Sequence, residues 1–402
     1  MTPARTARVA LAATLTIQIF TSFAGTATAV LAPEIAGDFG IDPRLIGVFI
    51  GTVYGGAMLA SIACGSFIER YGPIRVSQVC VALCASGVAA TAFAPASLPD
   101  LLALAAIVIG LGYGPITPAS SQLLQRTAPP ARMALTFSIK QTGVPAGAAL
   151  SGALLPGLAL LGGWRATFVG VALVGAIVVA LAQPIRGRLD GEHSPRRPMS
   201  FAGIVAPLAL VWRSKPLLML ALVSFAYSAT QVCLTSYLVV YLTGSLGFSL
   251  VSAGLALTAT TLAGAAGRIG WGMVADRLLA PRKVLALIGL IAAGCALAMA
   301  TSTPRWPAAL VIGLATCFGA TAIGWNGVQL SEVARLAPPG AAGKVTGAAS
   351  VITFAGVVIG PPSFALLSSL TGGYRAGFAS LAVASGFAAV ALLSREPHTI
   401  DA

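Results

Sequence analysis

Two basic residues lie inside long apolar stretches of the chain, where a charged side chain is rarely found. Lys140 falls in the run from Ala134 to Leu161, and Arg268 falls in the run from Ser249 to Ala275. A cation in the middle of a membrane-spanning helix costs at least about 3 kcal/mol, so such a residue usually faces a cavity and has a binding role. An ammonium and a guanidinium both donate charge-assisted hydrogen bonds to carboxylates, so the predicted chemistry is anion binding.

The two cations lie at a similar expected depth in the membrane. Lys140 follows Arg132 by eight residues and Arg268 precedes Asp276 by eight, and these flanking charges should mark the membrane edge. A rise of about 1.5 Å per residue places each cation roughly 12 Å below it. Two other interpretations stay open: Lys140 extends back to the surface, or Arg268 binds carbonyl groups of a broken helix or pairs with Glu332.

The rest of the chain supplies the helices that must position these cations. The 402 residues are 57% hydrophobic and only 9% charged, which is typical of a protein that crosses a membrane many times. Each predicted helix is an apolar stretch long enough to span a bilayer. We therefore expect an all-α membrane protein with twelve transmembrane helices, at residues 9–32, 46–68, 75–94, 101–124, 134–161, 165–184, 216–242, 249–275, 283–301, 307–332, 344–370 and 374–394.

The net charge of +13 follows membrane topology and does not indicate a nucleic-acid-binding protein. If both termini lie on one side, that side carries about 18 of the 24 Lys and Arg residues. The opposite side carries Arg44, Arg165, Arg305 and Arg375. Positive charge concentrates in cytoplasmic loops, so we expect a multi-pass protein of the bacterial inner membrane with cytoplasmic N- and C-termini.

The chain divides into two halves that repeat one another. The one long polar segment predicts a linker at 185–215, between bundles of six helices at 1–184 and 216–402. Three segments of the first half recur in the same order about 209 residues later, which indicates an internal duplication of the kind found in many secondary transporters. The matching segments are 65–70 with 272–277, 128–130 with 337–339, and 162–168 with 372–378.

The segments 65–70 and 272–277 both read Gly-x-x-x-acid-Arg and precede further basic residues. This pattern resembles the loop signature of the major facilitator superfamily, and the resemblance covers essentially the whole chain. It implies two pseudo-symmetric six-helix bundles that rock around a central cavity, and a transporter rather than an enzyme. In that signature the charged residues hold one conformation of the protein, so the implied conformational gate consists of Glu69, Arg70, Arg75, Asp276 and Arg277.

The segment around Arg268 also resembles helix eight of the monocarboxylate transporters and of the oxalate:formate antiporter, where an arginine four residues before the loop glycine binds the substrate carboxylate. The chain departs from that branch at Gly264, which replaces an acid, at Thr26, which replaces a lysine, and at Ser350, which replaces a second cation. The superfamily's architecture implies that helices five and eight lie side by side, so that Lys140 would approach Arg268 from the other half.

Polar and aromatic residues on the family's cavity-lining helices complete the expected site. With Lys140 and Arg268, the predicted substrate-binding residues are Gln141, Thr26, Tyr113, Tyr227, Gln231, Trp325 and Asn326. The resulting hypothesis is a secondary active transporter of small organic anions, monocarboxylate-like, that works by alternating access.

Two alternatives to anion transport stay open. One is a proton-driven exporter of drug-like compounds, because Gly347, Gly356, Gly360 and Pro361 form a pattern that drug antiporters carry on helix five, whereas here it falls on helix eleven. The other is a non-transporting receptor built on the same fold.

Acidic residues are expected only near the ends of the helices, so the sequence does not identify the proton carrier of a symporter. Glu34, Glu332 and Lys140 are the candidates, and symport, antiport and uniport are all consistent with the sequence. The six cysteines lack the spacing of metal ligands, and we expect no metal and no cofactor. The expected partners of this presumed monomer are the lipid bilayer, an organic anion and, in a symporter, protons, but no nucleic acid.

Overall fold

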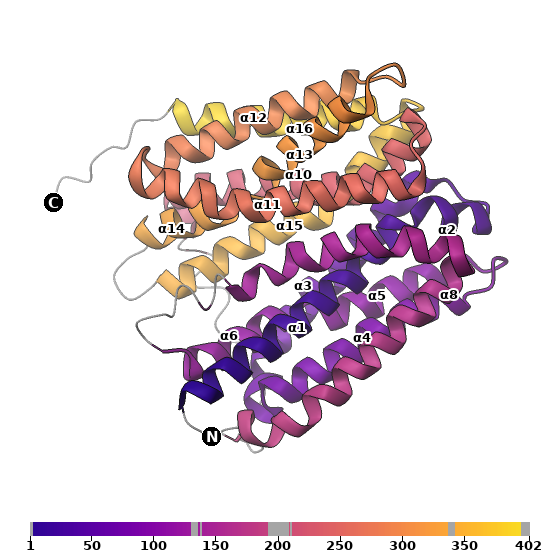
Figure 1. Ribbon diagram of the computed structural model, residues 1–402. Helices are drawn as coiled ribbons and strands as arrows, with labels where there is room; N and C mark the ends of the chain where they lie inside the picture. The colour runs from indigo at the N-terminus through magenta and orange to yellow at the C-terminus, as the bar shows by residue number, and fades with distance from the viewer. Residues whose placement is uncertain are drawn as a thin grey trace.

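Long helices run side by side in two bundles in the computed structural model of the protein (Figure 1). The structure describes residues 3–129, 136, 139–191, 209, 211–336 and 342–394. The first bundle contains α1 (Pro3–Val30), α3 (Ile46–Tyr71), α4 (Pro73–Phe93), α5 (Leu101–Tyr113), α6 (Ile116–Thr127) and α8 (Gly143–Leu189). The second contains α10 (Lys215–Leu246), α11 (Leu250–Arg277), α12 (Pro281–Thr301), α13 (Ala308–Ala322), α14 (Asn326–Leu336), α15 (Ala342–Leu370) and α16 (Arg375–Leu393).

Within these described ranges, 11 helical segments are long and apolar enough to cross a membrane. One of them, Ile139–Leu189, has 51 residues and contains Gly163, whose φ of 80° is not helical. Glycine adopts this backbone conformation without strain, so the chain turns at Gly163 and crosses the membrane twice. The predicted all-α fold, with twelve membrane helices in two six-helix bundles, is confirmed.

Several helix boundaries differ from the prediction. The sixth membrane helix continues through Pro184 to Leu189, and residues 192–208 and 210 of the expected linker lie outside the described part of the chain. A short helix that the sequence analysis missed, α2 (Ala32–Phe39), follows α1 and leads to a 3-10 helix, η1 (Pro43–Leu45). Its signals are ordinary ones, a proline in the first turn and Gly40 with φ 64° at the C-cap.

The fourth membrane crossing of each bundle is broken near its middle. In the first bundle the break separates α5 from α6 at Gly114 and Pro115, and in the second it separates α13 from α14 at residues 323–325. Proline contributes to the first break because it has no backbone N–H to donate. Irregular backbone at membrane depth is tolerated where it is buried in protein or lines a cavity, so both breaks mark the interior of the molecule.

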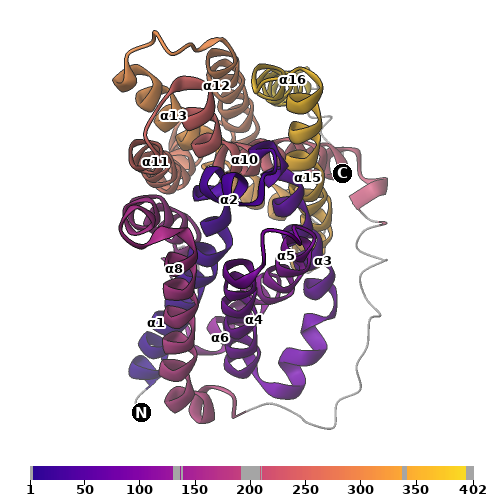
Figure 2. The same ribbon diagram turned by 90° about the vertical axis from the view of Figure 1, so that its right-hand side faces the viewer.

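The two bundles meet at the end of the molecule where α2 lies, which Figure 2 shows from that end. The Tyr237 hydroxyl of α10 donates to the carbonyl oxygens of Arg44 at 3.1 Å and Pro361 at 2.9 Å. The Arg44 guanidinium in turn donates to the carbonyl oxygen of Gly372 at 2.9 Å. From this α2 end the bundles diverge toward the end at which α1 begins, which the charge bias predicts to be cytoplasmic (Figure 1).

Candidate functional site

A cavity lies between the two bundles, near the middle of the membrane-spanning helices. Its volume is about 60 Å³. Both bundles contribute to its wall, so a ligand in it would contact both. The lining residues are Ser22, Gly25, Thr26, Val53, Tyr54, Tyr113, Val144, Pro145, Ala148, Gln231, Val232, Thr235, Thr261 and Ile323.

Lys140 lies just before α8 and is only 1% exposed. Its ammonium donates to the amide oxygen of Gln18 on α1 at 2.8 Å and to the hydroxyl of Thr117 on α6 at 3.5 Å. Both partners are neutral and belong to the first bundle. The interpretation that Lys140 extends to the membrane surface is therefore wrong, because a short polar network holds the ammonium inside the protein.

Arg268 on α11 is held at the break in the second bundle. Its Nε donates to the carbonyl oxygen of Ile323 at 3.1 Å, between α13 and α14. The interpretation that Arg268 binds a carbonyl group of a broken helix is confirmed, whereas Glu332 pairs with Arg335 at 2.6 Å and not with Arg268. Ile323 lines the cavity, so Arg268 lies directly behind this part of the wall, although it is not itself one of the lining residues.

The helices that carry the two cations pack against each other, as expected for helices five and eight. The Thr258 hydroxyl of α11 donates to the carbonyl oxygen of Ala149 on α8 at 2.9 Å. A methyl group at Gly152 would lie 2.5 Å from the carbonyl oxygen of Gly254, so the two backbones are in direct contact there. Neither Lys140 nor Arg268 has a carboxylate partner among the residues that the structure describes.

Lys140 and Arg268 are not among the lining residues of the cavity, and the structure brings only some of the remaining predicted site residues to it. Thr26, Tyr113 and Gln231 line it, and the Asn326 amide donates to the Gln231 amide oxygen at 3.2 Å. Gln141 is partly exposed and is not part of the cavity wall.

Tyr227 and Trp325 pack inside the second bundle and do not line the cavity. The Tyr227 hydroxyl donates to the carbonyl oxygen of Leu285 at 2.8 Å. The Trp325 ring meets the Tyr227 ring edge-on, with centroids 5.9 Å apart. Sequence reasoning did not identify Gln18 and Thr117 as the partners of Lys140. Tyr54 also belongs to the cavity wall, where its ring meets that of Tyr113 edge-on with centroids 5.6 Å apart.

The implied gate residues are spread over the predicted cytoplasmic end. Arg70 is partly buried over the Tyr71 ring at 5.5 Å, and Arg75 and Arg277 are exposed. Asp276 is exposed and forms no ion pair with any described residue. The side chain of Glu69 lies outside the part of the structure that is described. The bundles diverge toward this end, and among the described side chains of this set no ion pair joins one bundle to the other.

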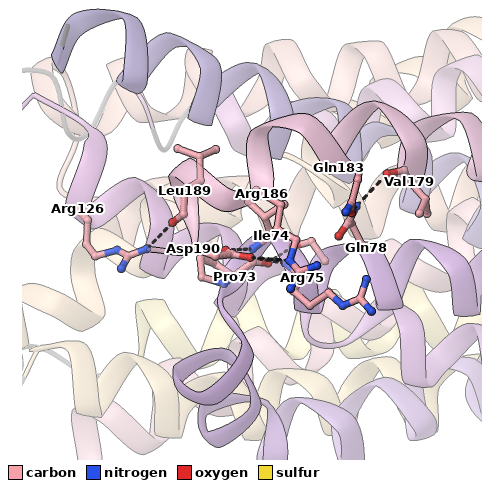
Figure 3. A network of polar contacts seen from close by, with 11 residues as sticks. Pro73, Ile74, Arg75, Gln78, Arg126, Val179, Gln183, Arg186, Leu189 and Asp190 are labelled. Carbon is pink, nitrogen blue, oxygen red and sulfur yellow. Dashed lines mark hydrogen bonds and ion pairs between the residues drawn. The ribbon is translucent and has the colours of Figure 1, made fainter. Parts of the chain in front are cut away.

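Asp190 is a functional candidate at this end that the sequence did not single out. Its carboxylate is buried and accepts the backbone N–H groups of Ile74 at 2.8 Å and Arg75 at 2.9 Å, which caps the N-terminus of α4 (Figure 3). Gly72 has φ 90°, and its missing Cβ leaves room for the Asp190 side chain. Arg126 donates to the carbonyl oxygen of Leu189, so the end of α8 is fixed to both α4 and α6.

The two acidic candidates for proton coupling lie in different surroundings. Glu34 is exposed in the first turn of α2, away from the cavity. Glu332 is 3% exposed, and both of its carboxylate oxygens accept hydrogen bonds from Arg335 on the same helix, at 2.6 and 2.7 Å.

The glycine pattern on α15 has a packing role. A methyl group at Gly356 would overlap the backbone of Phe225, and one at Gly360 would lie 2.7 Å from the Ala229 side chain, so both glycines fit α15 against α10. Pro361 accepts the Tyr237 hydroxyl at the contact between the bundles. None of these residues lines the cavity.

The geometry, two pseudo-symmetric bundles around a central cavity, agrees with comparison to known families. Residues 14–361 match the model described as Major Facilitator Superfamily. The chain belongs to the major facilitator superfamily. Among similar proteins, an uncharacterised superfamily transporter of Mycobacterium tuberculosis (strain ATCC 25618 / H37Rv) is 26% identical over 325 residues, covering 78% of this chain and 68% of that protein.

Two further comparisons concern a named transporter and a solved structure. The hexuronate transporter of Bacillus subtilis (strain 168) is 25% identical over 257 residues, covering 62% of this chain and 60% of that protein. A crystal structure of a bacterial homologue of the human lysosomal transporter Spinster, inward-facing and occupied, superposes with a TM-score of 0.78. It covers 98% of this chain and 97% of the other at 17% identity, so it shows a common fold only.

Proposed function

We propose that this superfamily transporter moves small organic anions, monocarboxylates and related acids, across the bacterial inner membrane by alternating access. The proposal rests on two cations, one from each bundle, that are hydrogen-bonded only to neutral groups among the described residues: Lys140 to Gln18 and Thr117, and Arg268 to the carbonyl oxygen of Ile323. Ile323 belongs to the wall of the cavity between the bundles, and neither cation itself lines that cavity. An unpaired cation in a low-dielectric interior is destabilising, and an anion between two such cations offsets that penalty for both.

The remaining support comes from what the cavity lacks and from a relative. Of the described residues, no carboxylate lines the cavity, whereas a carrier of organic cations needs a buried acid as counter-charge. The similar protein of Bacillus subtilis is named for hexuronate, which is an organic anion. The drug-exporter alternative rests on the glycine pattern of α15, and this pattern packs helices outside the cavity.

Alternating access requires two states, and the contacts between the bundles belong to one of them. Tyr237, Arg44 and Gly372 join the bundles at the α2 end, which the charge bias makes periplasmic. Opening that end and closing the other would expose the cavity to the periplasm. An anion bound by one cation from each bundle would couple these movements, since it interacts differently with the two states.

Uptake of radiolabelled carboxylates by proteoliposomes tests the proposal. We expect saturable uptake that other carboxylates inhibit and that Arg268→Ala abolishes. Failure of every anion to move or compete, together with transport of a hydrophobic dye, would establish the drug-exporter alternative. The proton coupling is read separately from the pH inside the liposomes at zero membrane potential, since symport acidifies the compartment that receives the substrate.

A further inference from the structure

Of the six hydroxyl groups in the cavity wall, the four that belong to serine and threonine already donate their hydrogen. Each of these four donates to a backbone carbonyl oxygen, as serine and threonine commonly do in helices. The donors and acceptors are Ser22 to Val144 at 2.6 Å, Thr26 to Ser22 at 2.9 Å, Thr235 to Gln231 at 3.2 Å, and Thr261 to Leu257 at 2.9 Å.

These hydroxyl oxygens therefore present lone pairs to the cavity. A hydroxyl group has one hydrogen to donate and two lone pairs to accept with, so an oxygen that has donated can still accept. Two of the four come from α1, one from α10 and one from α11, so acceptors from both bundles surround the same space. A ligand group in that space is best matched if it carries O–H or N–H donors.

The wall also contains the hydroxyl groups of Tyr54 and Tyr113, and further donors lie beside it. The Gln231 amide oxygen accepts from Asn326, which leaves the Gln231 amide nitrogen to donate into the cavity. Arg268 uses Nε for the Ile323 carbonyl, so its two terminal nitrogens are available for a carboxylate. A bound acid would place its carboxylate toward Arg268 and the rest of the molecule among the four hydroxyl oxygens.

We infer that the substrate is a hydroxylated carboxylic acid rather than a plain aliphatic one. This inference rests on the proposed function and specifies the substrate class of the same site. Ammonium groups would also supply donors, but Lys140 and Arg268 repel a second cation, which leaves hydroxyl groups as the matching donors. A methylene chain in the same space would exclude water and leave the free lone pairs of these hydroxyl oxygens without a second hydrogen bond.

Matched pairs of acids test this inference with the intact protein in proteoliposomes. Lactate is compared with propionate, and gluconate with hexanoate, as inhibitors of radiolabelled lactate and propionate uptake. Sites that bind a substrate hydroxyl group discriminate strongly against analogues that lack it, so we expect the hydroxylated member of each pair to bind at least about tenfold more tightly.

Variants of the cavity wall test whether its hydroxyl oxygens cause the preference for hydroxylated acids. Thr26→Val and Thr235→Val remove one acceptor each at nearly constant volume, and each should weaken binding of the hydroxy acid several-fold while leaving that of its deoxy partner unchanged. Thr243→Val, on the same helix as Thr235 but outside the cavity wall, is the matched control. The comparison of acids in the unmodified protein does not depend on whether the variants fold.

The failure of this inference is distinct from the failure of the proposed function. Equal affinities for the members of both pairs would overturn the inference and leave anion transport intact. Tighter binding of propionate and hexanoate would also overturn it. If no acid of either kind bound, both the inference and the proposed function would be wrong.

Discussion

Replacing Gly47 by alanine should open the α2 end of the transporter. A methyl group at Gly47 would overlap the Tyr237 hydroxyl and the Pro361 carbonyl oxygen and would lie 2.8 Å from the carbonyl carbon of Pro361. These atoms belong to the other bundle, so the clash exists only while the bundles are together. The variant relieves it by separating them rather than by unfolding.

The size of the effect follows from the overlap. Extra methyl groups in a well-packed interface cost about 1–3 kcal/mol, and contacts with backbone atoms lie at the upper end because backbone cannot rotate away. A penalty of about 3 kcal/mol shifts the balance toward the state open at the α2 end by about 100-fold. Gly51→Ala should shift it less, about fivefold for about 1 kcal/mol, because its nearest neighbour is the Pro362 ring at 2.5 Å, which can change its pucker.

Gly55→Ala is the control for both variants. It lies on the same helix, and a methyl group there would have no atom within 4 Å. All three variants gain the same helix propensity, about 1 kcal/mol, so differences between them report the contact between the bundles.

Distances between spin labels at the α2 end provide the measurement. Ser97 and Arg305 are exposed in loops of the two bundles, and cysteines there would carry nitroxides in a background without the native cysteines. We expect a longer distance to dominate in Gly47→Ala and to be rare in Gly55→Ala. Identical distance distributions in the two folded variants would refute the idea that the Gly47 contact holds this end closed.

Three further predictions concern the cations and the cap at the opposite end. Arg268→Lys should weaken anion binding at least about tenfold while the protein still assembles, because an ammonium lacks the bidentate fork of a guanidinium; unchanged affinity would assign Arg268 a structural role. The losses of binding free energy in Lys140→Ala and Arg268→Ala should be non-additive in titrations, because each variant removes one side of the same bridge, an anion bound by both cations. Lys140→Ala should not lower the melting temperature of the ligand-free protein. Additive losses together with a destabilised ligand-free protein would exclude the bridge. Asp190→Ala should lower the free energy of unfolding by about 1 kcal/mol, because the cap of α4 is lost. Asp100→Ala is the control, since the Asp100 side chain forms no capping hydrogen bond. Thermal unfolding measures both variants, and equal melting temperatures would contradict the capping role.

The fold could be predicted from the sequence because the membrane restricts the choices. Apolar runs long enough to span a bilayer must be helices. The charge bias predicts on which side of the membrane each helix ends, and the repeated segments indicate two equivalent bundles. The repeated Gly-Gly pair turns the chain in both halves, through the second glycine in one and the first in the other: Gly163 has φ 80° and Gly372 has φ 70°. The expected depth of Lys140 and Arg268 comes from counting residues along a helix, and it stays a prediction.

The partners of those cations could not be predicted, because they depend on contacts between distant segments. Gln18 lies 122 residues before Lys140 in the chain, and nothing in its local sequence distinguishes it from a packing residue. Asp190 stands in a polar segment that looked like a linker, and its role depends on docking at Gly72, 118 residues earlier. Tyr227 has the right type and helix for the cavity, but its rotation about the helix axis directs it to Leu285 instead.

One relation between the site and the fold recurs in both bundles. Lys140 contacts Thr117 in the first turn after the α5–α6 break, and Arg268 binds the carbonyl oxygen of Ile323 at the α13–α14 break. Each cation is thus linked to the broken fourth crossing of its own bundle. Under the proposed function, an anion that drew both cations toward the cavity would weaken both of these contacts at once. The bound and empty states would then differ at two symmetric breaks, where a helix without its full set of hydrogen bonds bends most easily.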